Sequence, residues 1–188
     1  GATPEIRDKT ANRFEIIHGE LHRLENIVKH FLSLAGPSSL ELRPVEITKV
    51  VDHVCELLRP EAAARGIEVV VRLPDSLPVV AADSAQLTQA LVNLVINAIQ
   101  AVERNGRVEV SAGRQEPDGA LTIAVRDTGQ GIPADKHSAI FEPFFTTKAE
   151  GSGLGLWIVQ QIITAHGGVV AASNVADGGA VLTVPLAG

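Results

Sequence analysis

The sequence predicts an α/β protein in which a mixed sheet is covered on one face by helices and is preceded by one long helix. Two observations support this fold class. Apolar residues recur at helical spacing through residues 1–36, and after residue 39 helical segments alternate with segments of strand-like apolar alternation. The 188 residues are enough for one substantial core and a short appendage. We therefore expect two parts, residues 1–36 and residues 37–188.

The N-terminal part carries a repeat typical of a coiled-coil or bundle seam. Its apolar positions, spaced by three and four residues, are Phe14, Ile17, Leu21, Leu24, Val28 and Phe31. Gly36-Pro37 ends the predicted helix. One such helix cannot bury its own stripe, so we expect it to pair with a second copy of the chain, with further sequence or with the domain behind it. An ordinary helix packed on its own domain is the alternative.

The elements after residue 39 are expected in a definite order. A strand at about 40–47 precedes a helix at about 48–65, and "IEVVVRL" predicts the next strand. A helix at 83–103 leads to "GRVEVSAGR" and "GALTIAVRD", an antiparallel pair joined by a turn at 117–119. A glycine-rich stretch then opens a helix that runs to residue 166, and "GGVVAASNV" with "GGAVLTVPLA" predicts a closing hairpin.

Composition argues against several classes of partner and compartment. The chain has 22 acidic and 16 basic residues and a net charge of −6, which argues against nucleic acid or an anionic membrane as partner. The single Cys55 can form neither an internal disulfide nor a cysteine metal site, so we expect a reducing, cytoplasmic location. The uncharged run from Ser84 to Val102 contains seven Ser, Thr, Gln or Asn residues, which predicts a soluble helix rather than a membrane span.

The predicted helix at 83–103 carries two asparagines on one face. Asn93 and Asn97 are four residues apart, so their amides project to the same side of the helix. A buried amide is costly unless it finds a hydrogen-bond partner. The pair predicts either a hydrogen-bond network in the core or contacts to a bound metal and phosphate, and on its own it favours the network.

The motif "RDTGQGI" places a carboxylate at the end of a strand. Asp127 ends the alternating segment, and Gly129 and Gly131 allow the chain to turn sharply there. A turn capped by an aspartate would explain the motif without any ligand. As a site, the carboxylate could accept a hydrogen bond from the exocyclic amine of adenine.

The stretch "KAEGSGLGL" precedes a helix directly. Its glycines Gly151, Gly153 and Gly155 leave backbone N–H groups free at the helix N-terminus, where phosphate binds favourably. We therefore expect a lid that closes over a polyphosphate, with Lys148 as the counter-charge.

Taken in order, "NLVINA", "DTGQG", "FEPFFTTK" and "GSGLGL" resemble the N, G1, F and G2 boxes of the sensor histidine kinases of two-component systems. These kinases belong to a superfamily with DNA gyrase, heat-shock chaperone ATPases and mismatch-repair ATPases. The resemblance covers about residues 40–186, and four boxes in one order are specific. It implies the Bergerat-type ATP-binding sandwich, with ATP and Mg²⁺ as ligands.

The resemblance also implies a role for each site residue. Asn97 would coordinate Mg²⁺, Asn93 would assist near the phosphates, and Asp127 would bind the adenine amine. Gln100 stands where many relatives have a basic residue, so that phosphate contact is either missing or supplied by Lys148. The other expected contributors are Gly129 and Gly131 at the base, the glycine lid with the amides of Gly153, Leu154, Gly155 and Leu156 at the phosphates, and Thr183 as a support of Asp127 from the last strand.

The helix "IIHGELHRLENIVKHFLSLA" resembles the second helix of the family's dimerisation and phosphotransfer hairpin. This implies a homodimer through that helix in the full-length protein and a response regulator receiver domain as partner. None of the six histidines is followed by the acidic residue and the proline that mark the family's acceptor. The resemblance therefore implies a kinase that phosphorylates a histidine outside this sequence.

Other readings within the superfamily stay open. Hydrolytic members usually have a glutamate as general base four residues before the metal-binding asparagine, and here that position is Asn93, which argues against a fast ATPase. A serine or other protein kinase and a slow ATPase remain alternatives. A silent binding module would need a damaged site, whereas all four boxes are intact.

Overall fold

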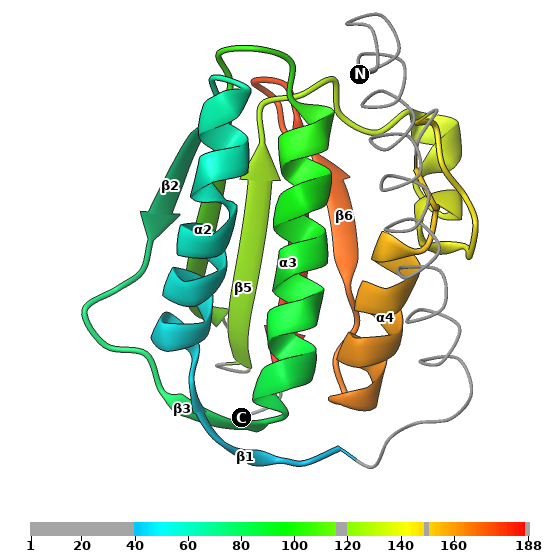
Figure 1. Ribbon diagram of the computed structural model, residues 1–188. Coiled ribbons are helices and arrows are strands. Elements are labelled where there is room, and N and C mark those ends of the chain that lie inside the picture. The colour runs from blue at the N-terminus through cyan, green and yellow to red at the C-terminus, as the bar shows by residue number, and fades with distance from the viewer. Residues whose placement is uncertain (1–39, 116–119, 149–150, 187–188) are drawn as a thin grey trace, which may run out of the picture. The chain divides into compact units, whose positions relative to one another are not determined.

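The computed structural model describes residues 40–115, 120–148 and 151–186 (Figure 1). These residues belong to one compact unit that begins at Leu40. The helix expected at 1–36, the turn at 117–119 and residues 149–150 of the glycine-rich stretch lie outside the described residues.

The unit is a two-layer α/β sandwich, as the sequence predicts (Figure 1). Its mixed five-stranded sheet has the order β2-β4-β5-β7-β6. Strand β2 (Glu68–Arg72) runs parallel to β4 (Arg107–Gln115). The other neighbours, β5 (Ala120–Asp127), β7 (Ala180–Leu186) and β6 (Ala171–Asn174), pair antiparallel. Both predicted hairpins, β4 with β5 and β6 with β7, are confirmed.

Three helices cover one face of this sheet, with α3 in the middle (Figure 1). They are α2 (Ile47–Ala64), α3 (Ser84–Ala101) and α4 (Gly155–Ala165), each within about two residues of the predicted bounds. Asp83 begins α3 because its side chain accepts from Ala85 N and Gln86 N, two donors of the first turn that have no partner within the helix. The run from Ser84 to Val102 is thus a helix of the sandwich, and no helix in the described ranges has the length and hydropathy of a membrane span.

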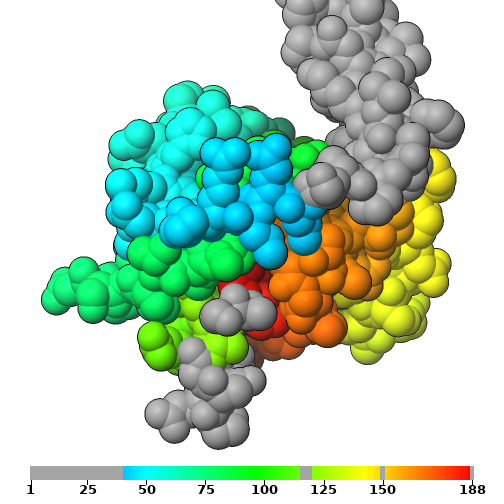
Figure 2. Space-filling model, turned by 90° about the horizontal axis from the view of Figure 1, so that it is seen from below, coloured from blue at the N-terminus to red at the C-terminus, as the bar shows by residue number. Residues whose placement is uncertain are grey.

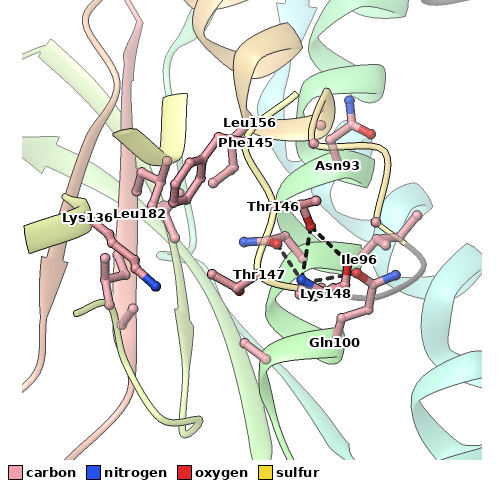
Figure 3. Close-up of a pocket in the computed structure, with 18 of the residues that line it drawn as sticks. Asn93, Ile96, Gln100, Lys136, Phe145, Thr146, Thr147, Lys148, Leu156 and Leu182 are labelled. Carbon is pink, nitrogen blue, oxygen red and sulfur yellow. Dashed lines mark hydrogen bonds between the residues drawn. The ribbon is translucent and has the colours of Figure 1, made fainter. Parts of the chain in front are cut away.

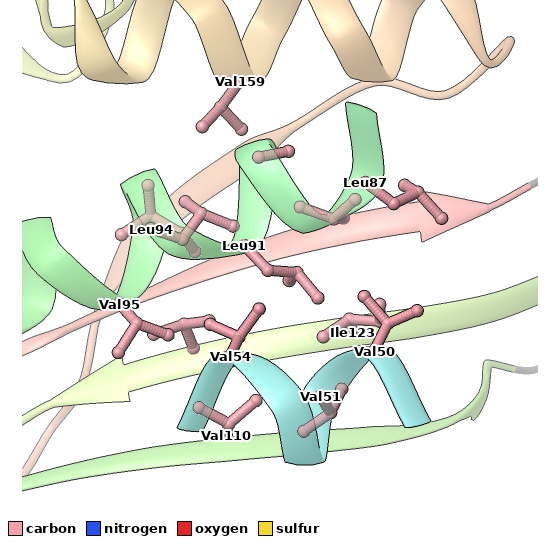
Figure 4. Close-up of a cluster of buried hydrophobic side chains, with 14 of the residues drawn as sticks. Val50, Val51, Val54, Leu87, Leu91, Leu94, Val95, Val110, Ile123 and Val159 are labelled. Carbon is pink, nitrogen blue, oxygen red and sulfur yellow. The ribbon is translucent and has the colours of Figure 1, made fainter. Parts of the chain in front are cut away.

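The core lies between the helices and the sheet, as Figure 4 shows. Strand β5 alternates between buried and half-buried residues, so its buried side chains all face the helices. A fully buried aliphatic side chain contributes about 1.5–3 kcal/mol relative to an exposed one. The residues at the centre of this layer include Val51, Val54, Leu87, Leu91, Leu94, Val95, Val110, Ile123 and Val159.

Three short elements were not predicted. Strand β3 (Val79–Ala82) pairs antiparallel with β1 (Arg43–Glu46) in a separate two-stranded sheet, which lies at the lower end of the helices in Figure 1. Two 3₁₀ helices, η1 (Ala134–Lys136) and η2 (Ala139–Phe141), occupy the connection from β5 to α4. Four residues after a proline-containing connection give too short a pattern to identify β3, whose partner is also distant in sequence.

Candidate functional site

A pocket lies between α3, the start of α4 and the connection that follows β5 (Figure 3). Helix α3 supplies one wall of the pocket. Residues of β5 and β7, namely Asp127, Ala180 and Leu182, also line it. Nine of the twelve residues selected from the sequence line it: Asn93, Asn97, Asp127, Gly131, Lys148, Gly151, Gly153, Gly155 and Leu156. Residues that the sequence selected from segments far apart along the chain therefore come together in one pocket.

Asp127 is the fixed carboxylate of this pocket, with only 3% of its surface exposed. Its Oδ1 atom accepts hydrogen bonds from Gly129 N at 2.8 Å and from Ala180 N at 3.3 Å. Burial raises the pKa of Asp127 above its ordinary value, while these two donors and the charge of Lys148 act against the rise. Both bonds from the described residues end on Oδ1, so Oδ2 is left to accept from a ligand in the pocket.

The predicted support of Asp127 by Thr183 is wrong. Thr183 pairs with Ala124, three positions before Asp127 in β5, and side chains three apart on a strand lie on opposite faces. Thr183 is half-buried on the far face of the sheet, whereas the support of Asp127 comes from the backbone N–H of Ala180. The alternation of β7 in the sequence, with Ala180, Leu182 and Val184 on its buried face, contains the signal that would have identified this position.

Lys148 reaches α3 with its side chain. Its Nζ atom donates to Asn97 Oδ1 at 2.8 Å and to Gln100 Oε1 at 3.0 Å (Figure 3). Burial lowers the pKa of Lys148, and the negative charge of Asp127 acts in the opposite direction. The lysine thus lies beside Gln100 and brings a positive charge to α3 from another part of the chain.

Asn93 presents an amide group without a partner. Its Nδ2 atom is buried and has no hydrogen bond to any described residue. Asn93 lines the pocket one helical turn before Asn97, on the side where α4 begins with Gly155. A buried donor left without an acceptor costs about 1–3 kcal/mol, so this amide is suited to an acceptor that a ligand brings.

Two of the predicted glycines are required by the backbone around them. Gly153 has φ +68°, and a Cβ atom there would collide with the backbone of Phe144. A Cβ atom on Gly129 would collide with the carbonyl of Ala101, so Gly129 lets the end of α3 approach Asp127 closely. Gly129 does not line the pocket but contributes its N–H to Asp127.

Leu154 serves packing rather than the pocket. Its side chain is 3% exposed and belongs to the core, and its residue precedes the first turn of α4. No side chain caps that turn. The amides of Gly155 and Leu156, which do line the pocket, are therefore at a helix N-terminus suited to an anion.

Sequence reasoning missed several lining residues. Lys136, in η1, directs its side chain into the pocket in Figure 3 and adds a second lysine to its wall. Phe145 and Leu182 contribute apolar surface beside it. Lys136 was missed because η1 was not recognised as structure. Phe145 and Leu182 lie in segments that the sequence did identify, but their spacing did not show that they face the pocket.

The described residues contain no group of three His, Cys, Asp or Glu side chains that could hold a metal by themselves. A cation in this pocket would therefore need oxygen atoms of a ligand in addition to Asn97 Oδ1. Mg²⁺ is commonly held in this way, through one or two protein oxygens together with phosphates and water. The donor set fits a metal that arrives with a phosphorylated ligand.

Comparison with known proteins gives a consistent result. Residues 82–187 match the family described as histidine kinase-, DNA gyrase B-, and HSP90-like ATPase. The sensor histidine kinase ZraS of Escherichia coli O157:H7 is 39% identical over 170 residues, which cover 90% of this chain and 37% of ZraS. The chain thus spans less than half the length of this curated relative.

Solved structures agree with the sequence relatives. The mycobacterial sensor histidine kinase MprB is 32% identical with a TM-score of 0.68, and the match covers 77% of this chain and 96% of that one. Full-length ShkA in complex with AMPPNP is 35% identical with a TM-score of 0.81, covering 100% of this chain and 40% of ShkA. The chain belongs to the histidine kinase-, DNA gyrase B- and HSP90-like ATPase family, and its described unit is a catalytic domain of the sensor histidine kinase type.

Proposed function

We propose that the pocket binds ATP with Mg²⁺ and that the domain transfers the γ-phosphoryl group to a histidine outside this sequence, for relay to a response regulator. The observation that carries this proposal is the presence, in one pocket, of an anchored carboxylate together with a lysine-asparagine cluster. The AMPPNP in the ShkA complex supports a nucleotide as ligand.

Base recognition rests on Asp127. Its Oδ1 is occupied by two backbone donors, so the free Oδ2 accepts the hydrogen bond from the adenine amine. Ile96, Ile132 and Leu182 line the same pocket and supply apolar surface for the flat ring. The carboxylate is held rigidly, so it selects a base that presents a donor at that point.

Phosphate recognition rests on the groups around α3 and the start of α4. The amide of Asn93 donates to a phosphate oxygen, which supplies the acceptor that its Nδ2 lacks. The N–H groups of Gly155 and Leu156 donate at the N-terminus of α4, and Lys148 provides the positive charge. Mg²⁺, when bound, would neutralise phosphate charge, and Asn97 Oδ1 is the oxygen of this chain that would hold it.

Phosphoryl transfer needs positioning and charge neutralisation more than covalent help from the protein. Lys148 and the helix N-terminus supply the neutralisation, and Asp127 with the α3 amides fixes the two ends of the nucleotide. No carboxylate stands at the position of Asn93, so water lacks a general base there. This favours transfer to an imidazole over hydrolysis and makes a slow ATPase the second candidate.

We further propose the partners that the family resemblance implies. The ThkA kinase, 30% identical with a TM-score of 0.78, has been solved in complex with the response regulator protein TrrA; the match covers 100% of this chain and 53% of ThkA. This supports a receiver domain as partner of the whole protein. A homodimer through residues 1–36, a cytoplasmic location of the domain and the absence of nucleic acid and membrane contacts are parts of the same proposal.

The proposal is tested by titrating the chain with AMPPNP in the presence and absence of Mg²⁺ and by measuring phosphate release from ATP. We expect binding that requires Mg²⁺ and phosphate release much slower than in the hydrolytic members of the superfamily. Absence of nucleotide binding would refute the proposal. Rapid release of phosphate would favour the ATPase.

A further inference from the structure

His166 connects the end of α4 to the beginning of α3. Its Nε2 atom lies 3.0 Å from Asp83 N, and its Nδ1 atom lies 2.8 Å from Ile162 O. Asp83 is the N-cap of α3, and Ile162 is in the last turn of α4. One imidazole ring therefore joins the two helices at the end of α4 that is opposite the pocket.

The two partners fix the proton of this ring. A backbone N–H such as that of Asp83 can only donate, so Nε2 must accept with its lone pair. A carbonyl such as that of Ile162 can only accept, so Nδ1 must carry the proton. His166 is therefore neutral in this arrangement, and only a side chain with an acceptor at the Nε2 position can replace it.

Asp83 extends the connection to the beginning of the described unit. Its Oδ1 accepts from Ala85 N and Gln86 N at 3.1 Å each, and its Oδ2 accepts from Glu41 N at 3.3 Å. Glu41 lies just before β1, where the chain enters the domain. The entry segment, the N-terminus of α3 and the C-terminus of α4 thus share Asp83 and His166.

Helix α4 spans the distance between this junction and the pocket. Its 11 residues begin at Gly155, beside the pocket, and end at Ala165, about 16 Å away at 1.5 Å per residue. Helices α3 and α4 run side by side in opposite directions (Figure 1). The first turn of α4 is therefore near Asn93 and Asn97, and its last turn is near Asp83.

Helices α3 and α4 also contact each other within the core, to which Leu91, Val159 and Ile162 contribute buried aliphatic side chains. Hydrophobic contact holds two helices together, but it is non-directional and specifies their position along each other's axes less sharply than a hydrogen bond does. Hydrogen bonds are directional and weaken steeply when displaced. The bonds of His166 therefore fix how far along α3 the first turn of α4 lies.

We propose that His166 is a positioning residue that sets the amides of Gly155 and Leu156 against the asparagines of α3 and links the pocket to the chain entry at Glu41. This inference rests on the proposed nucleotide site. A nucleotide that draws the start of α4 toward α3 shifts the other end of α4, and with it the contact of His166 with Asp83. By the same coupling, a displacement of Glu41 changes the position of the start of α4 at the pocket.

Three substitutions of His166 in the full chain distinguish the contribution of the acceptor at Nε2 from that of the donor at Nδ1. His166→Gln keeps an acceptor near the position of Nε2, His166→Asn keeps polar atoms only near Nδ1, and His166→Ala removes both. His53→Gln, at an exposed position of α2, is the matched control. The readouts are the affinity for AMPPNP by calorimetry and amide hydrogen exchange at residues 41–46 with and without AMPPNP.

We expect AMPPNP to slow exchange at Glu41 in the unchanged chain. His166→Ala and His166→Asn should weaken AMPPNP binding about tenfold, the effect of one hydrogen bond, and abolish the response at Glu41. The AMPPNP affinity of His166→Gln should stay within about threefold of that of the unchanged chain, and the response at Glu41 should persist. The control His53→Gln should behave like the unchanged chain in both measurements.

The outcomes that overturn the inference are distinct from failure of the nucleotide site. If the unchanged chain does not bind AMPPNP, the proposed site is wrong and the link falls with it. If the unchanged chain binds and His166→Ala binds equally well, or Glu41 still responds in that variant, the link alone is refuted. Equal losses in His166→Gln and His166→Asn would show that ring packing, and not the acceptor, matters, which also refutes it.

Discussion

Lys148 Nζ donates a 2.8 Å hydrogen bond to Asn97 Oδ1, although 51 positions separate the two residues in sequence. Asn97 Oδ1 is also the oxygen proposed to hold Mg²⁺. A lysine ammonium and a divalent cation repel each other at such close range. Binding of the metal with its nucleotide is therefore expected to move Lys148 from Asn97 toward the phosphates.

Replacing Asn97 and Gln100, the two acceptors of Lys148 Nζ, one at a time distinguishes the role of Asn97 in metal binding from its hydrogen bond to the lysine. Asn97→Ala should abolish the dependence of nucleotide affinity on Mg²⁺ and leave base recognition in place. Gln100→Ala removes the other acceptor but keeps the proposed metal ligand, so its Mg²⁺ dependence should match that of the unchanged chain. Calorimetric titration of AMPPNP at several Mg²⁺ concentrations checks both, and a persisting Mg²⁺ dependence in Asn97→Ala would remove Asn97 from the metal site.

Asp127→Asn should weaken adenine nucleotides by about 10–100-fold, because a charged hydrogen bond contributes about 1.5–3 kcal/mol and the amide can present a donor to the adenine amine. The fold should persist, since the amide oxygen can still accept from Gly129 N and Ala180 N. Asp75→Asn, on the exposed connection after β2, is the control. Unchanged affinity of the Asp127 variant in equilibrium titrations would show that this carboxylate does not contact the base.

Gly153→Ala should destabilise the chain by about 1–3 kcal/mol and weaken nucleotide binding, because its backbone has φ +68° and the new methyl group would collide with Phe144. Gly113→Ala in β4 is the matched control, since no atom lies within 4 Å of the added Cβ. Urea unfolding followed by circular dichroism measures both. Equal stability of the two variants would mean that the Phe144 contact does not constrain Gly153.

The stability of the domain should fall in acid partly because of Asp83. Burial tends to raise the pKa of Asp83, but the backbone N–H groups of Gln86, Glu41 and Ala85, which donate to its carboxylate, hold it below its ordinary value of 3.8. A lowered pKa in the folded state means that the ionised side chain adds stability above pH 3.8, and that this contribution is lost as the pH falls through the folded-state pKa.

Asp83→Asn keeps an acceptor for the N-cap of α3 but cannot ionise, so it should cost at most about 1 kcal/mol at neutral pH and reduce the acid dependence of the unfolding free energy. Asp75→Asn serves again as control. Urea unfolding between pH 3 and pH 6 measures the slopes, and an acid slope in Asp83→Asn as steep as in the unchanged chain would contradict the assignment.

The sequence predicted those parts of the fold that depend on local pattern. The helix around Asn93 and Asn97 has a periodic apolar face and an N-cap, and β5 alternates up to Asp127, so both elements and their polar ends were found. The four-residue strand β3 was not, because its pairing with β1 lies between segments 36 residues apart and leaves no periodic signal.

The errors at the site have the same physical origin. Thr183 was assigned by resemblance without regard to which face of β7 it occupies, and a shift of an odd number of residues reverses the face. The bond from Lys148 to Asn97 depends on how the loop after β5 folds back over α3, which no local pattern records. Sequence therefore identified the residues of the pocket better than it identified the contacts among them.

The most direct test of the central claim is phosphoryl transfer from γ-labelled ATP with Mg²⁺. The chain is incubated alone and together with a longer relative chain that contains an acceptor helix but has the asparagine equivalent to Asn97 replaced. The account predicts little stable label on the chain alone and acid-labile phosphohistidine on the added acceptor, lost when Asp127→Asn is used as the enzyme. Label on serine, or strong labelling of one of the chain's own six histidines, would contradict it.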